Sequence, residues 1–254
     1  MNYLRRIAVV SLTALLTISG GCGGGGSSGG SSVVPRPQTF GGLWVGTLGI
    51  DGVPGSQELV GISVDDGRFQ FLSVDTLGQF AGTARVTGGS VSGSGKGFAP
   101  PGTTWRDGST VTNVTFSGVL VERRTFEGSW STGTGESGSF DLAYDTEYEK
   151  DSSLSLVAGV WTVYDDNLNP FATFTVDAHG RFSGSNQVGC NSVGRISIID
   201  SRFAVYDFES TITSCVIAGD YKGLALLADL DNPNDALLAL VNNDQRALLL
   251  ALER

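Results

Sequence analysis

The chain has 254 residues, including 37 Gly, three Cys and one His, and only 17% of its residues are charged. Its 16 basic and 26 acidic residues give a net charge of −10, which argues against nucleic acid and anionic lipid headgroups as partners because both bind basic surfaces. A single histidine leaves little for a histidine-based metal site or for acid–base catalysis near neutral pH, so we expect no metal and no cofactor.

The first 21 residues have the pattern of a secretion signal. Arg5 and Arg6 precede an apolar run from Ile7 to Ile18, and three small residues follow at 19–21. The run is shorter than the roughly 20 residues that a membrane-spanning helix needs. We therefore expect residues 1–21 to be removed on export.

Cys22 lies between this signal and a Gly/Ser tract, so that residues 22–38 read as a flexible tether. A cysteine at this place resembles the lipidated cysteine of bacterial lipoproteins. The resemblance implies that acylated Cys22 holds the protein in the lipid bilayer, and Gly23 after it resembles lipoproteins sorted to the outer membrane. Without residues 1–21 the chain keeps 14 basic against 26 acidic residues, a charge of −12, so the anchor must be lipid rather than electrostatic attraction. The alternative is a free thiol at Cys22.

Beyond the tether, β-branched and aromatic residues alternate with small polar ones between closely spaced turn signals, which indicates an all-β protein. The first half supports strands near 42–49, 57–64, 67–73, 78–86, 89–97, 111–122, 125–132 and 137–144. The second half supports strands near 157–165, 171–177, 180–186, 192–199, 202–209, 221–229, 235–242 and 246–253. The Leu/Ala runs in the last two favour helix by propensity, but an Asn-Asn-Asp turn between them favours a hairpin.

The two halves repeat the same motifs in the same order. The motif from Val64 to Phe69 recurs, with one inserted residue, from Val176 to Phe182, and a Gly-x-Trp step opens each half. A duplicated unit of about 110 residues follows. We expect two tandem antiparallel meander barrels of about eight strands each, at 39–144 and 154–254, joined by an acidic linker at 145–153. One sandwich with a long internal loop is the alternative.

Trp44 and Trp161 stand at equivalent places at the start of the two halves. A Gly-x-Trp on the first strand of a meander resembles lipocalins and other calycin barrels. The resemblance implies that each indole closes one end of its barrel, whereas two ordinary core tryptophans are the alternative.

The second half resembles the META domain of HslJ-type lipoproteins over Leu156 to Arg254. The likeness is carried by its Gly-x-Trp opening, by Gly189-Cys190-Asn191, and by the run from Thr211 to Cys215. In an oxidising compartment Cys190 and Cys215 most simply form a disulfide, because neither a partner base nor a CxxC spacing is present for redox or nucleophilic chemistry.

The remaining motifs have plain structural interpretations. His179 is expected at a hairpin tip, and the Asp/Asn run at 229–235 is expected to be a turn, with calcium binding as the alternative. Trp105-Arg106 with Arg123-Arg124 is expected to be solvated, with a small anion-binding or cation–π surface as the alternative.

Together these features predict a monomeric, non-catalytic lipoprotein of the outer membrane that acts as a binding or envelope-stress module. A small barrel has room for packed side chains or for one small apolar ligand. The alternative function is a protein-interaction or hydrolase-inhibitor module, because the acidic surface would attract a cationic envelope protein. No Ser/His/Asp set can be assembled with one loop-tip histidine, so an enzyme is not expected; a hydrolase would need a carboxylate pair in a pocket.

Overall fold

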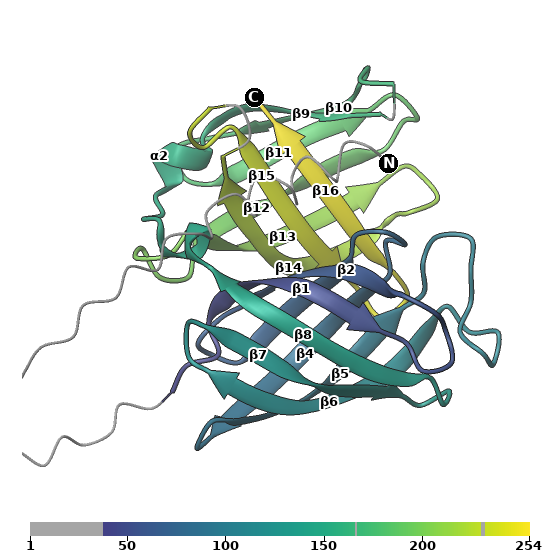
Figure 1. The fold of residues 1–254 in the computed structure, drawn as a ribbon. Helices are drawn as coiled ribbons and strands as arrows, with labels where there is room; N and C mark the ends of the chain where they lie inside the picture. Colours follow the sequence, from purple (N-terminus) through teal and green to yellow (C-terminus); the bar gives the residue numbers. More distant parts are fainter. Residues whose placement is uncertain (1–37, 166, 230–231) are drawn as a thin grey trace, which may run out of the picture.

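The computed structural model describes residues 38–165, 167–229 and 232–254, and its strands form two closed, eight-stranded antiparallel barrels (Figure 1). The first barrel contains β1 (Gly42–Gly49), β2 (Ser56–Ser63), β3 (Arg68–Ser73), β4 (Gln79–Thr87), β5 (Ser90–Phe98), β6 (Val111–Val121), β7 (Thr125–Thr132) and β8 (Ser137–Asp145). The second contains β9 (Gly159–Tyr164), β10 (Pro170–Val176), β11 (Arg181–Asn186), β12 (Asn191–Ile198), β13 (Val205–Thr213), β14 (Gly219–Ala228), β15 (Ala236–Asn242) and β16 (Ala247–Glu253). The prediction of an all-β chain with two tandem meander barrels is confirmed.

The connection between the barrels is short and partly ordered by local contacts. It contains a 3₁₀ turn, η2 (Thr146–Glu149), and one helical turn, α2 (Leu154–Val157). The carboxylate of Asp145 caps η2 by accepting a hydrogen bond from the Glu147 N–H at 2.9 Å. The sequence predicted an acidic linker at 145–153, and within it Tyr148 is 3% exposed and packs between the two barrels.

Equivalent turns follow the second strand of each repeat, as the repeated motif predicts. Gly67 and Gly180 both have positive φ, +92° and +75°, where a side chain would be strained. The Gly67 carbonyl accepts a hydrogen bond from the Ala84 N–H of β4 at 2.8 Å, and the Gly180 carbonyl accepts one from the Ile196 N–H of β12 at 2.7 Å. The two hairpins therefore share one backbone geometry.

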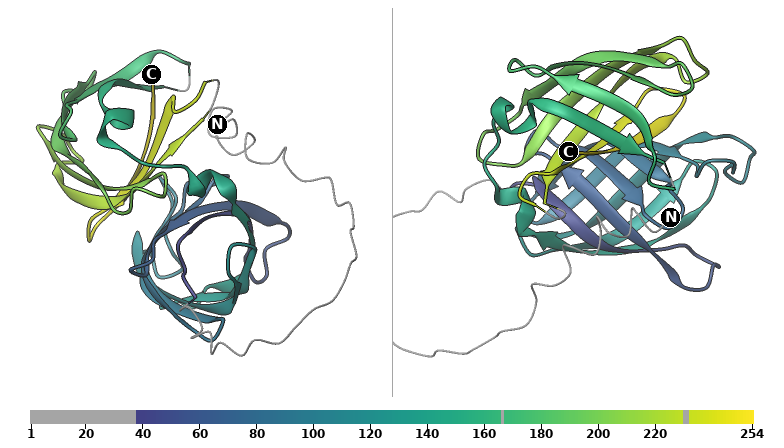
Figure 2. Two further views of the ribbon diagram at one scale, coloured as in Figure 1. Left: turned by 90° about the vertical axis from the view of Figure 1, so that its left-hand side faces the viewer. Right: turned by 90° about the horizontal axis from the view of Figure 1, so that it is seen from above.

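The two barrels pack side by side through an apolar interface that sequence reasoning did not anticipate (Figure 2). The outward faces of β1 and β2 meet those of β13 and β14. The shared cluster of buried residues consists of Leu43, Ile62, Val64, Tyr148, Ala204, Val205, Leu224 and Leu226. Ile62 is fully buried although it points away from its own barrel, so the interface acts as a third core between the two barrel interiors.

This interface also explains the Leu/Ala run that favoured helix by propensity. Every residue of β15 from Ala236 to Val241 is buried. One set of alternate side chains lies in the interior of the second barrel, while Leu238 and Leu240 face outward where β15 contacts β3. A strand buried on both faces reads as a continuous apolar run instead of an alternating one.

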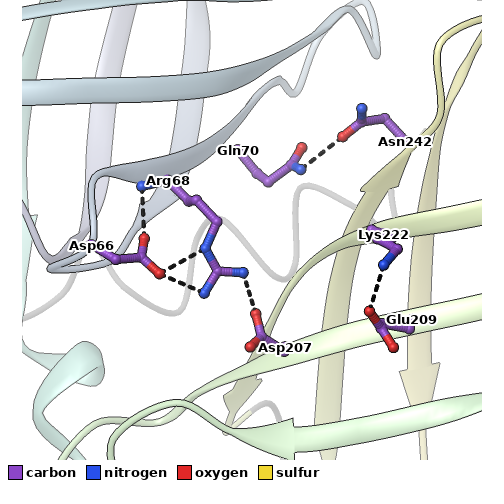
Figure 3. Close-up of polar contacts among 7 residues, drawn as sticks. All are labelled: Asp66, Arg68, Gln70, Asp207, Glu209, Lys222 and Asn242. Carbon is purple, nitrogen blue, oxygen red and sulfur yellow. Dashed lines mark hydrogen bonds and ion pairs between the residues drawn. The ribbon is translucent and has the colours of Figure 1, made fainter.

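Polar contacts border the apolar interface (Figure 3). The Arg68 guanidinium bridges Asp66 of its own barrel, at 2.7 Å, and Asp207 of the other barrel. The hydrogen bonds that Arg68 donates to the two carboxylates, with the one to Asp66 contributing more, raise the pKa of Arg68 further above its usual value. Beside it, Gln70 Nε2 donates to Asn242 Oδ1 at 2.8 Å. These contacts fix how the barrels are oriented against each other.

Candidate functional site

The interior of the first barrel contains a cavity lined only by apolar side chains. Its volume is about 40 Å³. Its eleven lining residues come from seven of the eight strands and are Leu48, Leu59, Phe69, Phe71, Phe80, Val114, Phe116, Phe126, Trp130, Phe140 and Leu142. Because no polar group faces this space, it suits an apolar guest and offers little to water.

Inward-facing glycines make room for these aromatic rings. Gly61 pairs with Phe71, Gly93 with Phe116, Gly128 with Phe140 and Gly138 with Trp130 across neighbouring strands. A Cβ built on Gly93 would lie 2.3 Å from the Phe116 ring, and one on Gly128 would lie 2.7 Å from the Phe140 ring. Each ring thus lies over a strand position that has no side chain, and part of the high glycine content serves this packing.

Trp44 lies on the first strand of this barrel and is fully buried. Its Nε1 donates to Ser63 Oγ at 2.9 Å, and Ser63 Oγ donates to the carbonyl of Phe40. The Trp44 and Phe126 rings are in edge contact, with centroids 5.9 Å apart. These contacts give the indole nitrogen a partner and pack the ring within the core of the first barrel.

The other end carries the longer loops of the first barrel, at 50–55, 74–78, 99–110 and 133–136. Trp105 in the longest loop lies beside the half-buried Phe80, with ring centroids 6.4 Å apart, and its Nε1 donates to the Gly97 carbonyl at 3.2 Å. Trp130 Nε1 donates to the Gly49 carbonyl at 3.1 Å. Both indole nitrogens are satisfied by backbone, so the rings present only apolar surface at this mouth.

Glu136 ties two loops of the mouth together. Its carboxylate accepts a hydrogen bond from the Arg106 N–H in the 99–110 loop, at 2.7 Å, and another from the Thr132 hydroxyl, at 2.6 Å. Partial burial works against the charged form, but the hydrogen bonds from Thr132, Thr134 and Arg106 outweigh it and lower the pKa of Glu136 to about 2.

The second barrel has a packed interior of its own. Trp161 is fully buried there and donates from Nε1 to the Val157 carbonyl at 2.8 Å. The Phe182 and Phe208 rings lie 4.9 Å apart. The two predicted tryptophans are therefore both buried at the start of their barrels, but they use different hydrogen-bond partners.

The predicted disulfide between Cys190 and Cys215 is confirmed, with the two Cα atoms 5.0 Å apart. It joins the turn between β11 and β12 to the turn between β13 and β14. Cys190 is buried and packs with the interior of the second barrel. The bridge is therefore part of the structural core of this barrel.

Cys22, the signal and the glycine tether lie outside the described residues. Within those residues, none of the helices is long and apolar enough to cross a membrane. His179 is exposed in a turn, where its backbone N–H donates to Asp177. In the 229–235 run, Asp229 is engaged by Lys150 at 2.6 Å and by the Asn234 N–H at 2.7 Å. The part of the chain that the structure describes contains no cluster of His, Cys, Asp and Glu suited to a metal ion.

The two basic–aromatic motifs are not brought together. Trp105 and Arg106 precede β6 and Arg123 follows it, so they lie at opposite ends of an eleven-residue strand. Arg123 instead pairs with Glu149 at 3.0 Å and lies 5.9 Å from the Phe203 ring centroid, next to the linker.

Sequence reasoning identified the apolar strands but did not single out the residues that line the cavity. Alternation of apolar residues shows which side chains face inward, and the glycine opposite each large ring was the additional signal. Comparison with protein-family models, curated proteins and solved structures finds no match to this chain.

Proposed function

We propose that the protein is a non-catalytic binding lipoprotein of the bacterial outer membrane, whose first barrel takes up a small apolar molecule. The observation that carries the proposal is the cavity itself. All of its lining side chains are apolar, the buried Trp44 packs against one of them, Phe126, and loops border the other end of the barrel. In such a site the binding free energy comes from burial of apolar surface and from shape complementarity, not from hydrogen bonds. The expected ligand is therefore a small hydrocarbon or aromatic compound without charge.

The cavity sets the size of the ligand. Its volume of about 40 Å³ is far below the roughly 300–1,000 Å³ that is usual for small-molecule pockets. A ligand must therefore be slim and must move the aromatic side chains that line the cavity. We expect benzene- to naphthalene-sized compounds to bind and large polycyclic lipids to be rejected.

Titration with naphthalene, followed by tryptophan fluorescence and by native mass spectrometry, tests this proposal. Val114→Phe fills the cavity from β6 and is expected to abolish binding. Val119→Phe is the matched control, because Val119 lies on the same strand but faces solvent with 55% of its surface exposed. Equal binding by the two variants, or no binding by the unmodified protein, would rule out the cavity as the site.

The location is a separate part of the proposal and rests on Cys22. The small residues before it and the glycine tract after it support acylation at this position. Labelled palmitate should be incorporated into the full chain and should be lost in Cys22→Ser, which should also leave the membrane fraction. Unchanged membrane association of Cys22→Ser would contradict the lipid anchor.

A further inference from the structure

Phe40 fills part of the interior of the first barrel although it does not belong to a strand. It lies in the segment 38–41, which has no regular secondary structure and leads into β1 at Gly42. Phe40 is 2% exposed and belongs to the same apolar cluster as most of the residues that line the cavity. Figure 1 shows this segment, in purple, at the end of the barrel away from the loops of the mouth.

The Phe40 ring lies directly behind two of the rings that line the cavity. Its centroid is 5.3 Å from that of Phe126, in edge contact, and 6.4 Å from that of Phe116. Phe116 and Phe126 both face the cavity. The Phe40 ring also stacks with Trp44, with centroids 6.4 Å apart. If Phe40 withdraws, the two lining rings can move into the space that it leaves, and the cavity grows by about one ring.

Few contacts hold the backbone of this segment in place. Residues 38–41 make no backbone-to-backbone hydrogen bond with any other described residue. The Phe40 carbonyl accepts a hydrogen bond from Ser63 Oγ, and Thr39 Oγ1 donates to Glu122 Oε1 at 3.2 Å. The neighbouring strand β1, in contrast, is paired with β2 on one side and with β8 on the other. The segment can therefore detach at a lower free-energy cost than any strand of the barrel.

We propose that Phe40 is a displaceable plug of the ligand site: an apolar ligand occupies the space behind Phe116 and Phe126 by expelling the Phe40 ring and detaching the segment 38–41. The inference rests on the proposed function, because it concerns the same cavity. The cavity volume of about 40 Å³ is well below the roughly 150 Å³ of an apolar cavity that takes up benzene, so an interior side chain must yield. The entering ligand gains the burial that the Phe40 ring loses.

Competition with the plug sets the affinity of the unmodified protein. When a ligand binds only the open form, its apparent affinity is reduced by the fraction of molecules in that form. Minor forms of this kind are typically populated at about 0.1–10%. Removal of the Phe40 ring should therefore strengthen ligand binding about 10- to 1,000-fold.

Naphthalene titration of Phe40→Ala in the full chain tests the plug. This variant should bind naphthalene at least about tenfold more tightly than the unmodified protein. Phe40→Leu keeps an apolar side chain but lacks the ring, so its affinity should lie between the two, and it serves where Phe40→Ala does not fold. Phe98→Ala is the matched control with unchanged affinity, because Phe98 is a buried phenylalanine of β5 that neither lines the cavity nor belongs to the cluster around Phe40.

Amide hydrogen exchange of the unmodified chain is a second readout that needs no substitution. Naphthalene should speed exchange in residues 38–41 and leave exchange in β1 unchanged. The plug is wrong if naphthalene slows exchange in residues 38–41, or if the unmodified protein binds naphthalene and both Phe40 variants bind it no more tightly.

The same titration separates the plug from the proposed function. Binding by the Phe40 variants but not by the unmodified protein would contradict the proposed function and support the plug. Absence of binding by the unmodified protein and by both variants would overturn the two together.

Discussion

The ring of Phe71 lies directly over Gly61 on the neighbouring strand, so that a Cβ built on Gly61 would lie 1.8 Å from Cδ1 of Phe71. Gly61 is on β2 and Phe71 is on β3, and both face the cavity of the first barrel. The absent side chain and the large ring are therefore one packing unit. Similar pairs recur around this barrel, which makes the size of the cavity sensitive to single methyl groups.

Gly61→Ala is expected to push the Phe71 ring into the cavity. Overpacking of this kind costs about 1–3 kcal/mol of stability. Naphthalene binding should weaken as well, because the displaced ring occupies part of the site. Denaturant unfolding and the fluorescence titration measure the two effects. Gly49→Ala is the control, since the nearest atom to its Cβ would be the Ser139 hydroxyl at 3.3 Å; equal effects of the two substitutions would contradict this packing model.

The interface between the barrels predicts that the chain unfolds as one cooperative unit. Ile62 lies in the shared apolar cluster with Leu224 and Leu226 and is fully buried. Ile62→Ala should cost about 2–5 kcal/mol, which is typical of removing a buried aliphatic side chain. Calorimetry should also show the single transition splitting into two as the barrels uncouple. Thr47→Ala, on the exposed outer face of β1, should leave the transition unchanged.

The interface can also be tested by producing the two barrels as separate fragments. Residues 38–150 and 152–254 each contain a complete barrel, so each is expected to unfold cooperatively. Each half also exposes the apolar face that the other covers in the whole chain. We expect the halves to self-associate or to bind each other when mixed, as measured by sedimentation. Halves that stay monomeric and do not bind each other when mixed would show that the interface contributes little to the stability of the chain.

Much of the fold follows from the sequence because most strands have one face in a core and one face in solvent. In β6, for example, alternate residues such as Val114 and Leu120 are buried while Thr115 and Val119 are exposed, and the strand bounds predicted from this pattern agree closely with the structure. Such a pattern shows which side chains face inward.

The features that sequence reasoning missed depend on relations between distant segments. The interface is built from outward-facing residues such as Ile62 and Leu240. Their apolar side chains interrupt the alternating pattern of the strands, but the pattern alone does not indicate that a second barrel covers them. The cavity depends on the volume left between side chains from seven strands, and the short seam of the second barrel depends on the register between β9 and β16. None of these quantities is encoded in one local pattern.

Loss of the disulfide is expected to destabilise the second barrel specifically. Cys190 and Cys215 are separated by 25 residues, and closing a loop of that length stabilises the folded state by roughly 3–4 kcal/mol on the chain-entropy model. Because the two barrels unfold together, the double variant Cys190→Ser and Cys215→Ser should lower the urea midpoint of their shared transition. Naphthalene binding by the first barrel should be unchanged at low denaturant. A first barrel that loses its ligand as well would mean that the bridge acts on the whole chain.

Protonation of Glu136 is expected to loosen the mouth of the cavity only in strong acid. The folded-state pKa of about 2 lies below the ordinary value for glutamate, so the charged form stabilises the packed loop. That stabilisation is present in full above the unfolded pKa, near 4.3, and is lost as the pH falls through the folded pKa. Glu136 accepts a hydrogen bond from Arg106, the neighbour of Trp105, so Trp105 fluorescence should report the transition.

Glu136→Ala should remove that acid transition and should speed the entry and release of naphthalene already at neutral pH. Glu127→Ala, exposed on β7, should keep both the transition and the rates, and an acid transition that persists in Glu136→Ala would assign it to another group.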